Sequence, residues 1–220
     1  MIAYVEPITE PVKTPTKQKI RVLLLAIHYP FAIKNYFEKA FQHRGDVDLI
    51  TVGPYTSNWI PWMGGMYLDK KYDHTPTIPL MYPMMDVNYD LIRANLPPSW
   101  NPDLVITIDA GVNWKNKPSE GYVVTIGTDP HVLDYDHARG ISDKFFNMQE
   151  CYSRPNDIYL PYAYSVYDHF PSHTVSRDVD AVLIGMPYPN RMDWVNGLRQ
   201  MDMLRQLNNV SRNCGISKKV

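Results

Sequence analysis

Asp129 and His131 are the residues whose types and spacing best suit chemistry in this sequence. They directly follow an apolar run, residues 122–126, that is typical of a buried strand. In open parallel α/β sheets, ligands bind beyond the carboxyl ends of the strands. A carboxylate beside an imidazole can orient the ring and raise its basicity, which suits removal of a proton from a hydroxyl near neutral pH. Alternatively, Asp129 caps a helix and His131 is simply hydrogen-bonded.

Three further strand ends place polar or aromatic side chains on the same predicted edge. His28 and Tyr29 follow the run 19–27, Gly53-Pro54-Tyr55 follows the run 47–52, and Asp109 follows the run 103–108. These residues predict a cleft at this edge of the sheet. Asp109 could equally structure its loop as an Asx turn, and His28 could be a buried histidine with a purely structural role.

Two tryptophans, Trp59 and Trp62, lie in a long segment without clear periodicity, residues 53–86. A connection of this length inside a compact domain is usually functional or disordered. Its aromatic rings could stack on a sugar or another flat apolar face. The other interpretation is a loop that packs onto the sheet.

A second candidate site follows the apolar run 180–185, which ends in Gly185 and leads to Arg191. A glycine at the end of a strand lets a ligand approach the backbone closely, and an arginine on the same loop can pair with a diphosphate through two hydrogen bonds. Arg191 could also be a solvated turn residue.

Several known motifs are missing from the sequence. The first strand is followed by His28-Tyr29-Pro30 instead of the glycine-rich turn of a dinucleotide fold. There is no P-loop, no nucleophile elbow and no cluster with metal-ligand spacing. Residues 129–134 begin like a cobalamin-binding motif, but Asp134 stands where that motif has glycine.

The elements that must position these residues alternate between strand and helix. The runs 19–27 and 47–52 predict strands on either side of a helix over residues 31–43, which is a β-α-β opening with a parallel sheet. Runs 103–108 and 122–126 predict two more strands. The fold class is therefore α/β, a Rossmann-like parallel sheet with flanking helices. We also expect a helix beginning near Lys144, capped by Asp143.

The domain organisation follows from changes in composition along the chain. Residues 1–18 are rich in proline, threonine and lysine and predict a flexible leader. Residues 19–171 predict one Rossmann-like domain. Residues 172–220 predict a linker and the first β-α unit of a second, truncated Rossmann-like domain.

The composition excludes several classes of protein. The 220 residues are 45% hydrophobic and 20% charged with a formal net charge of −1, as expected for a soluble globular protein. A nucleic-acid-binding protein normally carries a basic face. The longest apolar run, residues 22–27, is too short to span a bilayer. Two cysteines give no disulfide framework, so a cytoplasmic location is the simplest expectation.

The order of several short patterns resembles one family. They are the run 19–27, Gly53-Pro54, Ile60-Pro61-Trp62, Thr128-Asp129-Pro130-His131, Ser142-Asp143, Tyr159-Leu160-Pro161-Tyr162-Ala163, and the run 182–185 with Arg191. Together they resemble the N-terminal portion of CgeB-like (spore-maturation type) glycosyltransferases, which have the two-domain GT-B fold. The resemblance covers about residues 19–207.

The resemblance implies transfer of a sugar from a nucleotide-sugar donor to a glycan, protein or small-molecule acceptor, without an obligatory metal or other cofactor. Asp129 and His131 would lie on the acceptor side as catalytic residues. The acceptor-side cleft would also contain His28, Tyr29, Trp59, Trp62 and Asp109. Gly185 and Arg191 would lie near the donor diphosphate. The usual place of the donor-base contacts falls beyond Val220, so we expect weak or absent turnover for these 220 residues alone.

Two other hypotheses stay open. The chain could be a non-catalytic module that binds a glycan or a protein, derived from a truncated glycosyltransferase. It could also be an unrelated Rossmann-like enzyme that uses a small nucleotide, although the first turn lacks the expected glycines. An incomplete second domain would leave the run 182–184 without a sheet to join, which would favour self-association.

Overall fold

The computed structural model describes residues 18–30, 32–56, 59–60, 66–67, 75–81, 84–109, 111–163, 193 and 196–197. At positions 59, 60, 66, 67 and 109 this description covers the backbone only. The predicted leader 1–18 and the predicted second domain 172–220 therefore lie almost entirely outside the described residues. Within the described part of the chain, no helix is long and apolar enough to cross a membrane.

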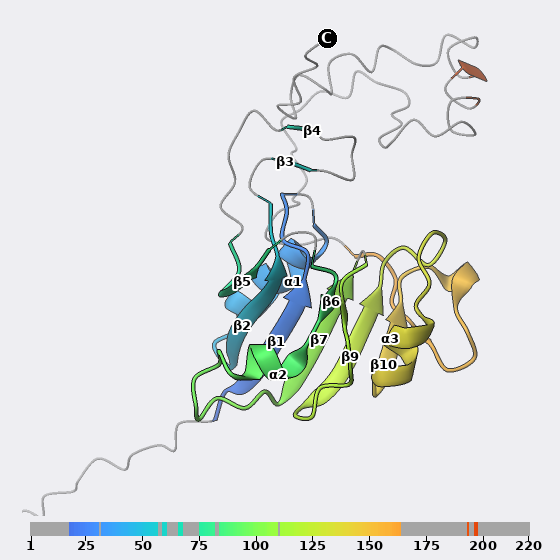
Figure 1. The fold of residues 1–220 in the computed structure, drawn as a ribbon. Coiled ribbons are helices and arrows are strands. Elements are labelled where there is room, and N and C mark those ends of the chain that lie inside the picture. The colour runs from blue at the N-terminus through green and yellow to red at the C-terminus, as the bar shows by residue number, and fades with distance from the viewer. Residues whose placement is uncertain are drawn as a thin grey trace, which may run out of the picture.

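A seven-stranded sheet with flanking helices forms the centre of the fold (Figure 1), which confirms the predicted α/β class. Every pair of neighbouring strands in it is parallel. The strand order is β11-β10-β9-β7-β1-β2-β5. The strands are β1 (Ile20–Ala26), β2 (Val47–Pro54), β5 (Ile78–Leu80), β7 (Leu104–Asp109), β9 (Tyr122–Gly127), β10 (Lys144–Asn147) and β11 (Ile158–Tyr159).

The strand order reverses direction between β1 and β7. From β1 the chain first builds the sheet outward through β2 and β5, and then returns to the other side of β1 with β7, β9, β10 and β11. Such a reversal is the topological switch point of a doubly wound fold, and ligands bind there beyond the carboxyl ends of the strands.

Helices cover both faces of the sheet. Helix α1 (Lys34–Gln42) lies on one face, and α2 (Tyr89–Arg93) and α3 (Asp136–Ile141) lie on the other (Figure 1). From residue 22 to residue 26, β1 is an uninterrupted apolar run because it is buried on both faces there. Its Val22 and Leu24 pack in the cluster that includes the α1 residues Phe37 and Phe41, and Leu23 packs with the α2 residues on the other face.

Two pairs of short strands and one 3-10 helix are also present in the described residues. They are β3 (Trp59–Ile60) paired antiparallel with β4 (Met66–Tyr67), β6 (Asp86–Val87) paired parallel with β8 (Asn113–Trp114), and the 3-10 helix η2 (Glu150–Tyr152). β3, β4, β5 and β6 all come from the segment 53–86, for which the sequence predicted no regular elements.

One predicted helix is wrong. Residues 144–147 form strand β10 instead of a helix, so Asp143 has no helix to cap there. The Asp143 carboxylate accepts hydrogen bonds from the backbone N–H of Val123 at 2.8 Å and from Lys117 Nζ at 2.5 Å. Asp143 therefore ties the start of β10 to the start of β9.

Candidate functional site

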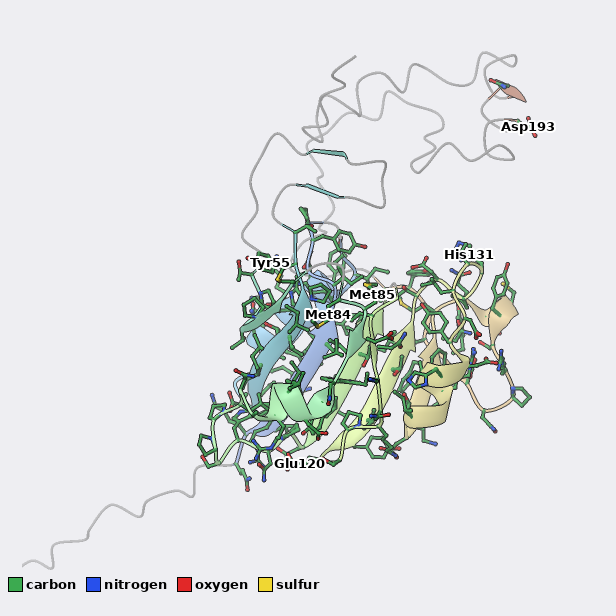
Figure 2. The ribbon with its side chains drawn as sticks, viewed as in Figure 1. Tyr55, Met84, Met85, Glu120, His131 and Asp193 are labelled. Atoms are coloured by element: carbon green, nitrogen blue, oxygen red, sulfur yellow. The ribbon has the colours of Figure 1, made fainter. Side chains whose placement is uncertain are left out.

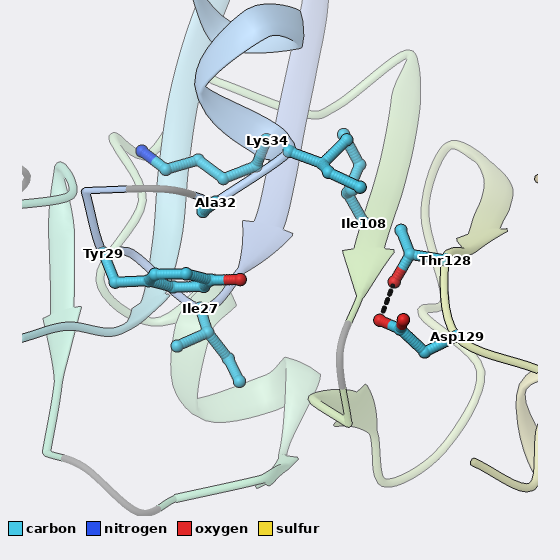
Figure 3. Close-up of a pocket in the computed structure, with 8 residues that line it drawn as sticks. Ile27, Tyr29, Ala32, Lys34, Ile108, Thr128 and Asp129 are labelled. Carbon is cyan, nitrogen blue, oxygen red and sulfur yellow. Dashed lines mark hydrogen bonds between the residues drawn. The ribbon is translucent and has the colours of Figure 1, made fainter. Parts of the chain in front are cut away.

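A crevice lies at the switch point, at the carboxyl ends of β1, β7 and β9. It contains about 310 Å³ of space that is not filled by atoms, a volume that includes open solvent. Its lining residues are Ile27, Tyr29, Ala32, Ile33, Lys34, Ile108, Thr128 and Asp129. Aliphatic side chains provide apolar surface, and Tyr29, Thr128 and Asp129 add polar groups (Figure 3). We call it the switch-point crevice.

Asp129 lies in this crevice, as its position after a strand predicted. Its Oδ2 accepts a hydrogen bond of 2.8 Å from the hydroxyl of Thr128. No described residue donates a hydrogen bond to Oδ1, and the residue is only half-buried. Asp129 is not the cap of α3, whose N-cap position is Tyr135. One carboxylate oxygen is therefore held in place and the other can receive a ligand group.

The loop that carries Asp129 connects β9 to α3, and a buried phenol holds its first residues. The hydroxyl of Tyr135, a residue only 2% exposed, accepts hydrogen bonds from the backbone N–H groups of Thr128 and Asp129, each at 3.2 Å. Tyr135 itself packs against Phe145 of β10 with ring centroids 5.5 Å apart. The core of the sheet thus fixes the position of the Asp129 backbone.

Replacing Tyr135 with phenylalanine tests this support. The ring would still fill its place, but the N–H groups of Thr128 and Asp129 would lose their acceptor. We expect a loss of about 2 kcal/mol in the free energy of unfolding, measured by urea denaturation followed by circular dichroism. Tyr122→Phe, at a tyrosine that is 47% exposed, is the matched control and should change little. Equal effects of the two variants would contradict the role given to the Tyr135 hydroxyl.

Tyr29 enters the crevice from the turn between β1 and α1. The side-chain amide of Asn35 donates to the carbonyl oxygens of Tyr29 at 3.1 Å and of Pro30 at 2.9 Å, which fixes this turn against the first turn of α1. In Figure 3 the Tyr29 hydroxyl points toward the side of the crevice that Thr128 and Asp129 form. A phenol and a carboxylate thus face one space from two different strands.

Lys34, a residue that the sequence analysis did not single out, forms part of the wall. It is 2% exposed, and its Nζ lies 2.5 Å from Oε2 of Glu38, one turn along α1. Burial lowers the pKa of Lys34, and the hydrogen bond and charge of Glu38 act in the opposite direction. Its ammonium group points away from Asp129 (Figure 3), so Lys34 contributes its stem to the crevice while Glu38 pairs its charge.

His131 is exposed at the same end of the sheet as Tyr55 and opposite Glu120 (Figure 2). The predicted dyad with Asp129 is not formed, since the structure gives no hydrogen bond between these two described side chains. His131 Nδ1 lies 3.1 Å from Nε2 of Gln149 instead, and its ring contacts Tyr152 with centroids 6.3 Å apart. The hydrogen-bond partner of His131 lies 18 positions away in the sequence, so the spacing of neighbouring residues does not reveal it.

The structure describes some of the other predicted site residues and leaves the rest outside the described ranges. His28 is fully buried after β1, with Nε2 3.3 Å from the carbonyl of Val52, and it does not line the crevice. Asp109 is the last residue of β7, beside the crevice, and its backbone pairs with Gly127. Trp59 is described only as part of strand β3. Trp62, Gly185 and Arg191 lie outside the described residues.

Among the described residues, no group of three or more histidine, cysteine, aspartate or glutamate side chains has the geometry to hold a metal ion. No protein-family model, no curated protein and no solved structure matches this chain. The geometry of the switch-point crevice is therefore the main guide to function.

Proposed function

We propose that the chain is the acceptor-side part of a glycosyltransferase, in which the switch-point crevice receives the acceptor. A nucleotide-sugar is the donor. Asp129 is the general base that takes the proton from the acceptor hydroxyl. This proposal keeps the function predicted from the sequence and assigns the proton transfer to Asp129 alone.

The observation that carries the proposal is the chemistry of the crevice wall. Asp129 offers a carboxylate oxygen, Thr128 and Tyr29 offer hydroxyl groups, and aliphatic side chains line the remainder. Carboxylate and hydroxyl groups form hydrogen bonds with the hydroxyls of a sugar or another polyol, and an apolar wall accommodates its C–H surface. A small pocket with a few convergent polar groups is the usual form of such a binding site.

In the proposed step, the acceptor oxygen attacks the anomeric carbon of the donor sugar. The new glycosidic C–O bond forms as the bond between the anomeric carbon and the diphosphate oxygen breaks. The acceptor hydroxyl proton passes to Oδ1 of Asp129, and the nucleoside diphosphate leaves with the electron pair of the broken bond. Oδ1 suits this role because Thr128 occupies only Oδ2.

The described chain just after β11 lies near the loop that carries Asp129. The hydroxyl of Tyr162 donates to the backbone carbonyl of Thr128 at 3.5 Å. The proposal keeps Gly185 and Arg191, which lie outside the described residues, as the predicted contacts of the donor diphosphate.

Saccharide titration of the ¹⁵N-labelled chain tests the acceptor site. With a panel of methyl glycosides, we expect amide shifts at Tyr29, Thr128 and Asp129. Asp129→Asn should weaken binding about tenfold, because a hydrogen bond to a charged group contributes more than one to a neutral group. The control is Asp90→Asn on α2, whose exposed carboxylate is not in the crevice.

Two results would count against the proposal. The absence of shifts with every glycoside would reject an acceptor site for saccharides. Equal binding by the wild type and Asp129→Asn would reject Asp129 as its central group.

A further inference from the structure

The hydrogen bonds around Gln149 define the orientation of its amide. The Gln149 side-chain nitrogen Nε2 lies 3.0 Å from the backbone carbonyl oxygen of Thr128 and 3.1 Å from Nδ1 of His131. A carbonyl oxygen only accepts, so the Gln149 atom that faces it must be the NH₂ group. The opposite orientation would place two acceptor oxygens 3.0 Å apart.

This orientation decides which nitrogen of His131 carries the proton. An amide nitrogen only donates, so the His131 Nδ1 that faces it must accept. We infer that Gln149 is a positioning residue that holds neutral His131 as the Nε2–H tautomer. His131 then presents a hydrogen-bond donor, not a proton acceptor, at its exposed Nε2.

The surroundings hold Gln149 in this place. Its backbone N–H donates to Oδ1 of Asn147 at 2.9 Å, and Asn147 is fully buried at the end of β10. On the other side, His131 is exposed, and no described residue forms a hydrogen bond with its Nε2. The protein therefore contacts the Nδ1 edge of the imidazole ring and leaves the Nε2–H edge to solvent or a ligand.

The tautomer assigns different roles to the two predicted catalytic residues. Asp129 has a carboxylate oxygen that can take a proton, and His131 has an exposed N–H that can donate a hydrogen bond but cannot take a proton at Nε2. This division of roles toward a ligand rests on the proposed function. The tautomer itself does not, because it follows from the hydrogen bonds of the ligand-free chain.

Two other histidines serve as internal standards. His43 Nδ1 lies 2.7 Å from the carbonyl oxygen of Lys39, so His43 must donate from Nδ1 and has the opposite tautomer. His137 Nε2 lies 2.9 Å from the carbonyl oxygen of Trp114, so it has the same tautomer as the one inferred for His131. A single sample therefore contains a reference for each form.

Long-range ¹H–¹⁵N correlation spectra of the imidazole rings measure the tautomers directly. The full 220-residue chain is labelled with ¹⁵N and recorded without ligand at about pH 9, more than two units above the ordinary histidine pKa. Single His→Asn variants assign the signals. We expect His131 to show the pattern of His137 and the reverse of His43, with Nε2–H in about tenfold excess, the factor that one hydrogen bond can contribute.

Two variants of Gln149 test its role. Gln149→Leu removes the donor, and the His131 signals should move toward a mixture of the two tautomers. Gln149→Glu offers an acceptor in place of the donor, and Nδ1–H should become the main form. The signals of His43 and His137 should stay unchanged in both variants, which also shows that the fold is retained.

A His43-like pattern for His131 in the wild type would overturn the inference. So would unchanged His131 signals in folded Gln149→Leu. The wild-type spectrum needs no variant, so it decides the tautomer even if a substitution prevents folding. Because no saccharide is present, a negative glycoside titration leaves this result intact, and the two proposals fail separately.

Discussion

Replacing Gly53 with alanine is expected to prevent stable folding. A Cβ at this position would lie 1.8 Å from the carbonyl oxygen and 2.9 Å from the carbonyl carbon of Ala26. Ala26 is a fully buried residue of β1, the central strand, and its backbone cannot move without breaking pairs with its neighbours. The φ angle of Gly53 is +149°, which adds strain for any residue with a side chain.

The expected cost exceeds about 4 kcal/mol, a large fraction of the stability of an ordinary domain. The close approach of Gly53 to Ala26 also matters for the site. Just beyond it, the N–H of His28 donates to the carbonyl of Pro54 at 2.8 Å, and the N–H of Thr56 donates to the carbonyl of His28 at 2.9 Å. These bonds continue the β1–β2 pairing up to the turn that carries Tyr29 into the crevice.

Urea unfolding of Gly53→Ala beside Gly45→Ala measures this effect. Gly45 precedes β2 in the chain and is exposed, and a Cβ added there would meet no atom within 4 Å. Its substitution should therefore change the free energy of unfolding by less than about 0.5 kcal/mol. Gly53→Ala should yield little soluble folded protein. A Gly53→Ala chain with nearly the stability of Gly45→Ala would contradict the close β1–β2 contact.

The strands that build the switch point could be predicted because apolar side chains dominate each of them. β1, β2, β7 and β9 are buried in the centre of a parallel sheet, where both faces require apolar side chains. β10 could not be predicted in the same way. Its four residues, Lys144–Asn147, are too few to show a period, and the preceding Asp143 has the residue type of a helix cap.

Only part of the candidate site could be predicted from the sequence, because several of its contacts join residues that are distant in the chain. The position of Asp129 follows from a general property of parallel sheets, which holds whatever the loop sequence is. The partners of the loop come from elsewhere: Tyr135 binds its backbone, Gln149 binds His131, and Tyr29 arrives from β1. Spacing within Asp129-Pro130-His131 gives no information about these contacts, so it could not reveal Gln149 as a partner of His131.

The Arg139–Asp157 ion pair is expected to contribute most among the charged pairs of the described residues. Arg139 donates from Nε and an amino group to the two oxygens of Asp157 at 2.9 and 2.8 Å. The side chain of Asp157 is 2% exposed and that of Arg139 is 16% exposed. Asp157→Asn removes the buried charge and leaves the guanidinium only the longer contact with the exposed Asp136 at 3.6 Å, which should cost about 3 kcal/mol.

The effect should depend on pH in a defined direction. Burial by itself raises the pKa of Asp157, but hydrogen bonds from Arg139, from the Arg154 backbone N–H and from Asn147 outweigh it, so the net pKa is lowered. Because the pKa of Asp157 is lower in the folded state, the ionised carboxylate stabilises the fold at pH values above its unfolded-state pKa of about 4. This stabilisation is lost as the pH falls through the folded-state pKa, and the difference between wild type and Asp157→Asn should shrink accordingly.

Asp46→Asn is the matched control, because Arg44 binds Asp46 with the same geometry at the surface. Its two hydrogen bonds are also 2.9 and 2.8 Å long, but the side chains are 57% and 37% exposed. Solvent screens such a pair, so Asp46→Asn should change the free energy of unfolding little at any pH. Unfolding of both variants by urea between about pH 7 and pH 3 separates burial from geometry. If both variants lost the same free energy of unfolding at neutral pH, burial would not strengthen the Arg139–Asp157 pair. If the loss for Asp157→Asn stayed constant down to about pH 3, the lowered pKa of Asp157 would be contradicted.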